Sequence, residues 1–425
     1  MGVPGYDTNQ RQGNPARICA HSSMLQPMLL RVIFWLIALA PLAWWLDREQ
    51  SAGRFQKVDE LFLDFLVANS REKITTPDPA AKKDDVLLIR LDPAERDEYA
   101  GWPAQPLDWQ MILKGLREAE NAVIVIPEPL SWGKPSPEFI PALAESMVPL
   151  SSLVLGVEAQ FAENFDGPAF TGGLDEVIPR FMKASGDLHL VPAFSALITA
   201  PDEQLRRHGE LGLLIEKRLP YVLREGDTFM PGVLAQALAR HTRTPYATHR
   251  LLLGPGAGAY LQNGLFVPLQ NNGEVAVDPK TIVPSINALD FLSGGLADAL
   301  TEENKARIKA AKIIVIGTDD KTQPSAARTH AQGLASILSL PRLRVLDRME
   351  QIILWSLAAL AGLWIVLRTP RQKAPTRGFL FIFVTIVAGF LAFQTTLLWF
   401  PPTMPVALLS ASAIIGSLIG RRHAS

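Results

Sequence analysis

The sequence predicts an α/β domain, a mostly parallel sheet with flanking helices, joined to four transmembrane α-helices. Two observations lead to this prediction. Four apolar stretches of about 16–20 residues, close to the length that crosses a bilayer, frame one long segment of ordinary globular composition. Within that segment, uninterrupted apolar strands alternate with helical patterns, which is typical of a parallel sheet covered on both faces.

The apolar stretches set the expected order of segments. In chain order we expect a cytoplasmic tail at 1–27, a first membrane helix at 28–46, an outer domain at 47–349, a second membrane helix at 350–367, a basic cytoplasmic loop at 368–378, membrane helices at 379–398 and 403–420, and a cytoplasmic tail at 421–425. The alternative for the first stretch is a cleaved signal peptide, but Pro41 directly follows the possible cleavage site, which favours an uncleaved anchor.

Basic residues close to the apolar stretches predict the orientation. The cytoplasmic flanks of membrane helices are enriched in Lys and Arg. The loop at 368–378 contains four cations and no acid, and further cations precede the first stretch and follow the last, at Arg11, Arg17, Arg31, Arg421 and Arg422. We therefore expect both termini in the cytoplasm and residues 47–349 on the opposite, outer side of the membrane.

Composition excludes several classes of protein. The 425 residues include 41 basic and 42 acidic side chains, so no nucleic-acid partner is expected. The single cysteine, Cys19, precedes the first stretch, so the outer domain must be stabilised by its core and not by disulfides. No nucleophile elbow, Walker sequence or metal-binding histidine pair occurs in the sequence. The run Gly254-Pro-Gly256-Ala-Gly258 superficially resembles a phosphate-binding loop, but a turn and not a helix follows it, which favours a plain loop. We predict a protein that is not an enzyme and that holds no cofactor or metal.

Within the outer domain, periodicity predicts the individual elements. A helical stalk is expected from Asp47 to Leu66, and a strand–helix–strand unit over 86–91, 107–119 and 121–126. Further strands are expected at 153–157, 188–191, 251–253, 275–277 and 313–316, and further helices at 230–239, 302–310 and 326–338.

Two groups of residues are candidates for binding or packing. Asp319 and Asp320 follow a predicted strand, and ligands bind at the carboxyl ends of parallel strands, although a solvated turn or a helix N-cap is an alternative. Trp102 lies in a loop after another strand, where it could form the floor of a ligand cleft or the edge of the core. Small residues recur every four positions in the last apolar stretch, at Ser412, Gly416 and Gly420, which favours close helix packing within the chain or in a homodimer.

Several local patterns occur in a recognisable order. They are Val86–Asp92, Gly101-Trp102-Pro103, Leu113–Ala119, Pro284–Leu289, Lys312–Gly317 and Thr329-His330-Ala331. This order, together with one apolar stretch before the outer domain and three after it, resembles the CHASE2 family of bacterial extracytoplasmic sensor domains. The resemblance covers residues 47–349 and implies that the membrane is the inner membrane of a bacterium, with residues 47–349 in the periplasm. It implies that 284–289 forms a closing helix and 312–317 a closing strand.

The resemblance also implies a function. CHASE2 domains usually have an acidic residue at the end of the second strand, and Glu128 stands two residues after that strand here. We therefore add Glu128 to the candidate ligand-binding residues. CHASE2 receptors commonly continue into a kinase or cyclase, whereas this sequence ends at Ser425. We expect a sensor of a periplasmic small ligand or envelope protein that signals to a separate cytoplasmic effector. The alternative is a non-catalytic accessory or scaffold subunit of an envelope complex.

Overall fold

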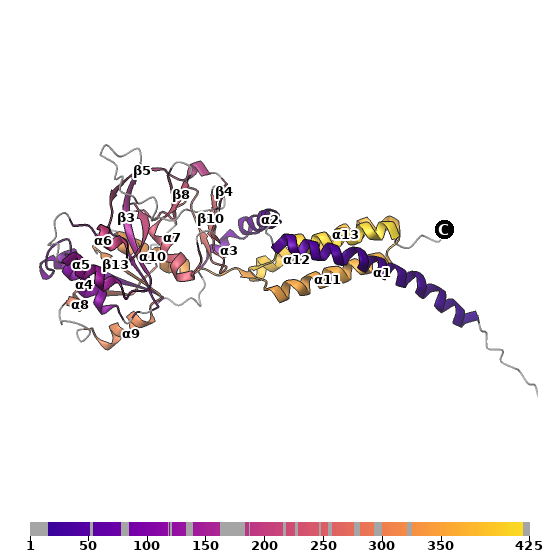
Figure 1. Cartoon of the computed structure of the whole chain (residues 1–425), viewed down its shortest axis with the longest axis horizontal. Helices are drawn as coiled ribbons and strands as arrows, with labels where there is room; N and C mark the ends of the chain where they lie inside the picture. The colour runs from indigo at the N-terminus through magenta and orange to yellow at the C-terminus, as the bar shows by residue number, and fades with distance from the viewer. Residues whose placement is uncertain are drawn as a thin grey trace, which may run out of the picture. The chain divides into compact units, whose positions relative to one another are not determined.

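The chain divides into two compact units. The computed structural model describes residues 16–51, 54–77, 85–117, 119, 121–132, 139–161, 183–186, 188–215, 218–225, 228–245, 248–253, 257–275, 281–292, 300–320 and 325–419. The α/β unit spans Ser70–Leu343, and the helical unit comprises the residues up to Asn69 and from Arg344 onward. Figure 1 shows the helices and strands of both units.

A seven-stranded sheet forms the centre of the α/β unit. Its strands are β1 (Val86–Leu91), β2 (Val123–Ile126), β3 (Leu153–Phe161), β5 (Phe194–Thr199), β6 (Glu210–Leu214), β12 (Ser285–Asn287) and β13 (Ile313–Thr318). The order is β12-β1-β13-β2-β3, and both β5 and β6 pair with β3. Every pairing is parallel except that of β3 with β5. The predicted parallel sheet is thus confirmed.

Both faces of this sheet are buried, because side chains on its strands alternate between two hydrophobic clusters. Leu87 and Ile89 face α4 (Pro106–Gly115), α5 (Phe139–Met147), α8 (Leu289–Leu292) and α9 (Glu302–Ala310). Val86 and Leu88 face α7 (Val233–Thr242) and α10 (Ala326–Leu338). Figure 1 shows α4, α5 and α8 on one side of β13 and α7 and α10 near its other side. Uninterrupted apolar strands are therefore explained by burial on both faces.

Smaller elements complete the α/β unit. A second sheet has the order β11 (Phe266–Pro268), β10 (Gly258–Tyr260), β9 (Arg250–Leu253) and β4 (Lys183–Gly186). The strands β7 (Val222–Glu225) and β8 (Thr228–Pro231) form a hairpin. Short helices are α3 (Arg71–Thr75), α6 (Glu203–Arg206) and the 3₁₀ turns Pro93–Glu98 and Leu188–Leu190.

The sequence predictions succeed for some elements and fail for others. The predicted segments 86–91, 302–310 and 326–338 coincide with β1, α9 and α10. The expected strand at 188–191 is wrong, because a 3₁₀ turn occupies 188–190. The expected helix at 284–289 is also wrong, because Ser285–Asn287 pairs with β1 as an edge strand. Of the expected strand 275–277, Val275 forms an isolated bridge and the rest lies outside the described residues.

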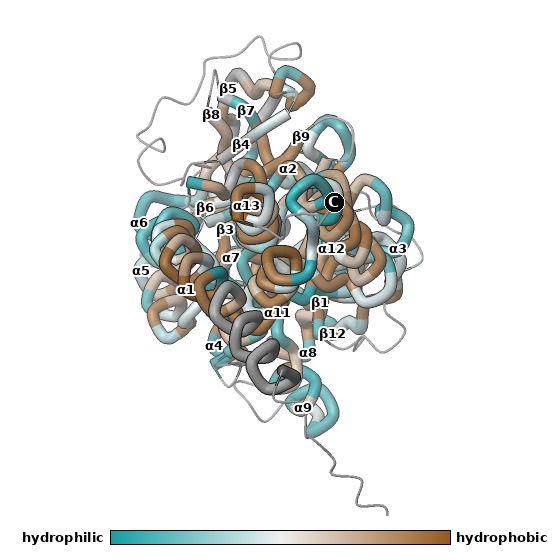
Figure 2. Tube along the Cα trace, turned by 90° about the vertical axis from the view of Figure 1, so that its right-hand side faces the viewer, coloured by the Kyte–Doolittle hydropathy of each residue, from teal (hydrophilic) through white to brown (hydrophobic). Residues whose placement is uncertain are grey.

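The helical unit contains apolar helices suited to a membrane. Its elements are α1 (Ala16–Ser51), α2 (Gln56–Asn69), α11 (Arg348–Arg368), α12 (Ala374–Thr396), α13 (Thr403–Ile419), the 3₁₀ turn Arg371–Lys373 and the paired strands β14 (Arg344–Val345) and β15 (Leu398–Trp399). Among the described residues, three segments are long and apolar enough to span a bilayer, namely Met28–Gln50, Arg348–Arg368 and Arg371–Thr396. Of the four predicted membrane helices, three therefore have the length and composition that spanning requires, whereas α13 has only 17 residues. Figure 2 shows the hydrophobic colouring of α1, α11 and α12.

Small residues allow α13 to approach α11 and α12 closely. A Cβ atom added at Gly362 of α11 would lie 2.2 Å from Ser412 Oγ, and one at Gly378 of α12 would lie 2.3 Å from Ala413 Cβ. Ser412 is fully buried and accepts a hydrogen bond from Trp35 Nε1 of α1 at 3.2 Å. Gly416 is also buried at this contact, whereas Gly420 lies outside the described residues.

The predicted continuous stalk is replaced by a helix that packs within the helical unit. α1 ends at Ser51 and α2 begins at Gln56, so no single helix runs through 47–66. The buried Asp59 of α2 accepts hydrogen bonds from the backbone N–H and the hydroxyl of Thr403, at 3.1 and 2.7 Å. Phe62 packs on Trp399, with ring centroids 6.0 Å apart. Part of the apolar pattern that predicted a stalk, including Phe62 and the buried Leu66, therefore serves packing within the helical unit, whereas Val58 and Leu61 are exposed.

The contact between Gly362 and Ser412 predicts the effect of a larger side chain. Gly362→Ile should destabilise the full chain by about 1–3 kcal/mol, because overpacking forces the two helices apart. The matched control is Ser356→Ile, which places the same side chain at an exposed position of α11. The measurement is the thermal unfolding midpoint of the two variants in detergent micelles. Equal midpoints would contradict this packing.

Candidate functional site

The carboxyl ends of three neighbouring strands place polar residues at one edge of the sheet. β13 lies between β1 and β2, and Thr318 is in register with Leu91. The N–H of Asp319 continues this ladder by donating to Leu91 O at 2.9 Å. Glu128 follows β2 by two residues and reaches the same edge. The structure therefore brings together Glu128, Asp319 and Asp320, three of the four predicted site residues.

Asp319 stabilises the beginning of α10. Its side chain is 1% exposed, and it accepts hydrogen bonds from Ser325 Oγ at 2.9 Å and from the Arg328 guanidinium at 2.7 Å. Ser325 is the N-cap of α10, and its hydroxyl accepts from the N–H of Arg328 at 3.1 Å. The sequence left open whether Asp319 binds a ligand, lies in a solvated turn or caps a helix. The structure is closest to the last of these, although Ser325 is the N-cap and Asp319 supports it. Asp320 is half-buried beside it.

Glu128 occupies space that is open because residue 317 is a glycine. Its Oε1 accepts a hydrogen bond from the N–H of Thr318. A Cβ atom at Gly317 would lie 2.8 Å from that oxygen and 2.9 Å from Ala327 Cβ. Although the residue as a whole is half-buried, its carboxyl group turns inward, and burial raises the pKa of Glu128 to about 7. Glu128 is therefore able to hold or release a proton near neutral pH.

Trp102 lies in the loop between β1 and α4 and contributes mainly to packing. It is half-buried against the cluster on the α4 face and contacts Tyr99, with ring centroids 5.4 Å apart. The neighbouring Trp132 donates from Nε1 to Ala104 O at 2.9 Å, which fixes the loop after β2 against the loop before α4. Trp102 could have formed the floor of a ligand cleft or the edge of the core, and its position corresponds to the edge of the core.

Sequence reasoning missed other polar residues at this edge. Arg90, near the end of β1, forms an ion pair with the buried Asp92 at 3.5 Å. Asn287, at the end of β12, donates from Nδ2 to Glu95 Oε2 at 2.7 Å. An arginine within an otherwise apolar strand was the available signal for the first pair. The second pair was missed because 284–289 was expected to be a helix.

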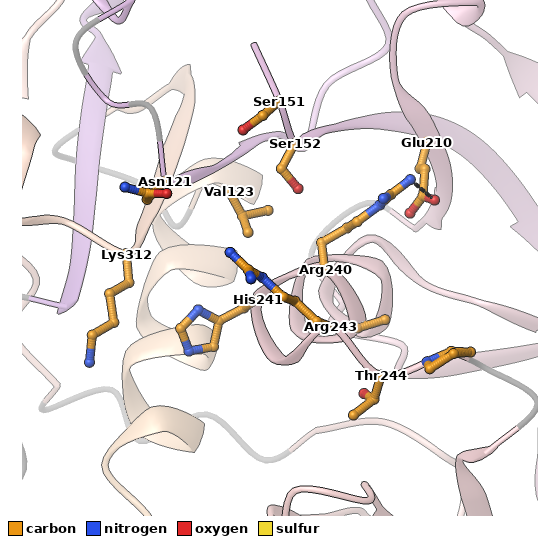
Figure 3. A pocket seen from close by; sticks show the side chains of 12 residues that line it. Asn121, Val123, Ser151, Ser152, Glu210, Arg240, His241, Arg243, Thr244 and Lys312 are labelled. Carbon is orange, nitrogen blue, oxygen red and sulfur yellow. Dashed lines mark hydrogen bonds and ion pairs between the residues drawn. The ribbon is translucent and has the colours of Figure 1, made fainter.

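A cavity of about 590 Å³ lies at the opposite, amino edge of the sheet. Residues before or at the start of β2, β3, β6 and β13 line it, together with the last turn of α7 (Figure 3). Sequence analysis did not predict a site there. Among the described residues, no group of three or more His, Cys, Asp or Glu side chains is arranged to hold a metal ion.

Comparisons with known proteins found no relative of this chain. No family model, curated protein or solved structure matches this chain. The resemblance to CHASE2 domains therefore remains a proposal that depends on the residue patterns of this sequence. At the carboxyl edge, most of the carboxylates have hydrogen-bond or ion-pair partners within the protein.

The different surroundings of Asp319 and Asp320 predict different costs of substitution. Asp319→Asn should destabilise the full chain by about 2 kcal/mol, because Arg328 loses a charge-assisted hydrogen bond to a buried carboxylate. Asp320→Asn, the matched control, should cost less than about 1 kcal/mol because the side chain is more exposed. Thermal unfolding midpoints of the two variants test this. Equal losses would show that Asp319 does not anchor α10.

The raised pKa of Glu128 predicts a pH dependence of stability. The unfolded state ionises Glu128 near its ordinary value while the folded state still holds the proton, so stability falls as pH rises from about 4.5 to about 7. Glu128→Gln removes this dependence and should stabilise the chain by about 1–3 kcal/mol at pH 8, with little effect at pH 4.

Thermal unfolding midpoints across this pH range provide the measurement. Glu98→Gln is the control, because Glu98 is exposed. If Glu128→Gln and wild type lose stability in parallel between about pH 5 and pH 8, the carboxyl group is not buried as described.

Proposed function

We propose that this chain is a membrane-anchored sensory protein of CHASE2-like type, in which the α/β unit detects a periplasmic small ligand or envelope protein. The division of the chain supports this best. A compact α/β unit is inserted between α2 and α11 of a helical unit rich in exposed apolar side chains. The chain passes from one unit to the other at only two places, Asn69–Ser70 and Leu343–Arg344.

The second passage is well suited to transmit a conformational change. Leu343 is the last residue of the α/β unit, and its N–H donates to Gly264 O at 2.7 Å. The next residue, Arg344, begins β14 in the helical unit, where its N–H donates to Leu397 O at 3.0 Å. Adjacent residues are thus fixed within different units. A ligand with different affinities for two arrangements of the α/β unit would shift their populations, and the change would reach α11 through this short connection.

Of the four predicted ligand-binding residues, Glu128 and Asp320 are the candidates for direct contact in this proposal, whereas Asp319 positions the start of α10 and Trp102 packs at the edge of the core. Glu128 is the strongest of them, because its carboxyl group lies at a strand end and changes protonation near neutral pH. A ligand that donates hydrogen bonds or carries a positive charge would complement this edge. The signal would pass to a separate effector on the cytoplasmic side, where the exposed cation Lys373 and its neighbours lie.

A non-catalytic scaffold subunit of an envelope complex is the second candidate. One observation favours it. Asp319 is bound by Ser325 and Arg328, and Glu95 by Asn287, so these acidic groups already serve the fold. A protein partner that recognises the outer surface would not need them.

Membrane sidedness is the first test of both candidates. In a Cys19→Ser background, Asp97→Cys places a thiol at a side chain that is 96% exposed, and Lys373→Cys places one in the basic loop. A membrane-impermeant maleimide applied to intact cells should label only the first, whereas permeabilised cells should show both. Labelling of Lys373→Cys in intact cells would contradict the proposed orientation.

Cross-linking separates the two candidates. A photoreactive residue at Gln372, exposed in the basic loop, should capture a kinase or cyclase if the chain is a sensor. The same residue at Leu360 of α11, which is exposed for contact with lipid, is the control. Capture of an envelope-synthesis or secretion component, with no signalling protein, would favour the scaffold.

A further inference from the structure

The amino-edge cavity joins parts of the α/β unit that are distant in sequence. Asn121 and Val123 come from the start of β2, Ser152 precedes β3, and Lys312 precedes β13. The last turn of α7 supplies three basic residues at or next to the end of the helix, Arg240, His241 and Arg243. A volume of about 590 Å³ lies within the range of cavities that hold small molecules.

Positive charge exceeds negative charge around this cavity. Arg240 is paired with Glu210, and Lys312 with Asp85 at 2.7 Å, so these two cations are balanced by acids. Arg243 also lines the cavity, and the one carboxylate among the lining residues, Glu210, is the partner of Arg240. Arg342 adds a further cation near His241. The sites that bind small anions have this excess of cations over acids.

The end of α7 does not require these cations for its own hydrogen bonding. The N–H of Arg243 donates to the carbonyls of Ala239 and Arg240, and the N–H of Thr244 donates to Ala239 O. The backbone therefore satisfies the last turn of the helix. Figure 3 shows the guanidinium of Arg243 extending toward Val123 and lying near the imidazole of His241, whereas the Lys312 side chain points away from them. Arg243 is also exposed, so its side chain is accessible to a ligand in the cavity.

The pKa of His241 reflects the same excess of positive charge around the cavity. Burial lowers the pKa of His241, and the nearby cations Lys312 and Arg342 lower it further, against the opposite effect of Asp85. A histidine that is kept neutral by its surroundings can still donate one hydrogen bond. The cavity thus offers donors from an imidazole, a guanidinium, an ammonium, a hydroxyl and an amide.

We propose that this amino-edge cavity binds a small phosphorylated molecule, whose phosphate is held by Arg243 beside His241 and Ser152. A phosphate presents several acceptor oxygens in a tetrahedral arrangement, and it can face donors that converge from separate elements. A carboxylate has two oxygens in a plane and suits a single bidentate arginine. The proposal is independent of the carboxyl-edge site, because it uses the opposite ends of the strands.

Calorimetry on the full chain in phosphatidylcholine nanodiscs tests this proposal. The probes are inorganic phosphate, glycerol 3-phosphate, glycerate and uncharged glycerol. Glycerol 3-phosphate should bind at least about tenfold more tightly than glycerate, since only the phosphate reaches all of the donors. No heat with glycerol 3-phosphate, or equal affinity for glycerate, would overturn the proposal.

Two variants assign the binding to the cavity. Arg243→Gly should weaken glycerol 3-phosphate at least about tenfold while leaving the unfolding midpoint equal or higher, because Arg243 has φ of 53° and glycine adopts that conformation without strain. Lys312→Gln is the matched control and should weaken binding by less than about threefold, because Lys312 is already paired with Asp85. Wild-type affinity in Arg243→Gly, or an equal loss in both variants, would place the phosphate elsewhere and refute this site.

A final arm distinguishes a free metabolite from a lipid headgroup. If nanodiscs that contain phosphatidylglycerol abolish glycerol 3-phosphate binding in the wild type, the occupant is an anionic lipid and the proposal of a small soluble ligand is overturned. Unchanged binding in these nanodiscs supports a soluble phosphorylated molecule.

Discussion

The central position of β13 is the constraint on which both candidate sites depend. This strand pairs with β1 over six residues and with β2 over three, although about 190 residues of sequence separate it from β2. Its carboxyl end brings Thr318 and Asp319 beside Glu128, and its amino end brings Lys312 beside Val123. A parallel sheet requires such crossovers, so neither group of residues can assemble before this late strand is inserted.

Glycine at position 317 shows how backbone packing and the chemistry of a side chain are coupled. Without a Cβ atom, β13 leaves room for both the carboxyl group of Glu128 and the methyl group of Ala327 on α10. The same close approach removes water from that carboxyl group and raises its pKa. A sheet position that is usually explained by strand packing therefore also determines when Glu128 ionises.

Periodicity predicted the α/β class and the long buried strands, because burial on both faces leaves an uninterrupted apolar run such as Val86–Leu91. It failed at 284–289, where three residues pair at the edge of the sheet and a short pattern has no distinctive period. It predicted Asp319 as a site residue from its place after a strand. It could not reveal that Arg328, nine positions later, satisfies that carboxylate, because the pairing depends on how α10 begins.

The amino-edge cavity was invisible to sequence reasoning for a related physical reason. Its donors, among them Ser152, Arg243 and Lys312, are far apart in the sequence, and each has an ordinary local explanation such as a turn or a basic helix end. Only the sheet order makes them neighbours. At the carboxyl edge, most acidic groups accept hydrogen bonds from residues of neighbouring helices and strands. At the amino edge, cations outnumber acids around an open cavity. If both sites are used, the sheet would respond to ligands at both ends of the same strand, β13, which is also the strand that determines their spacing.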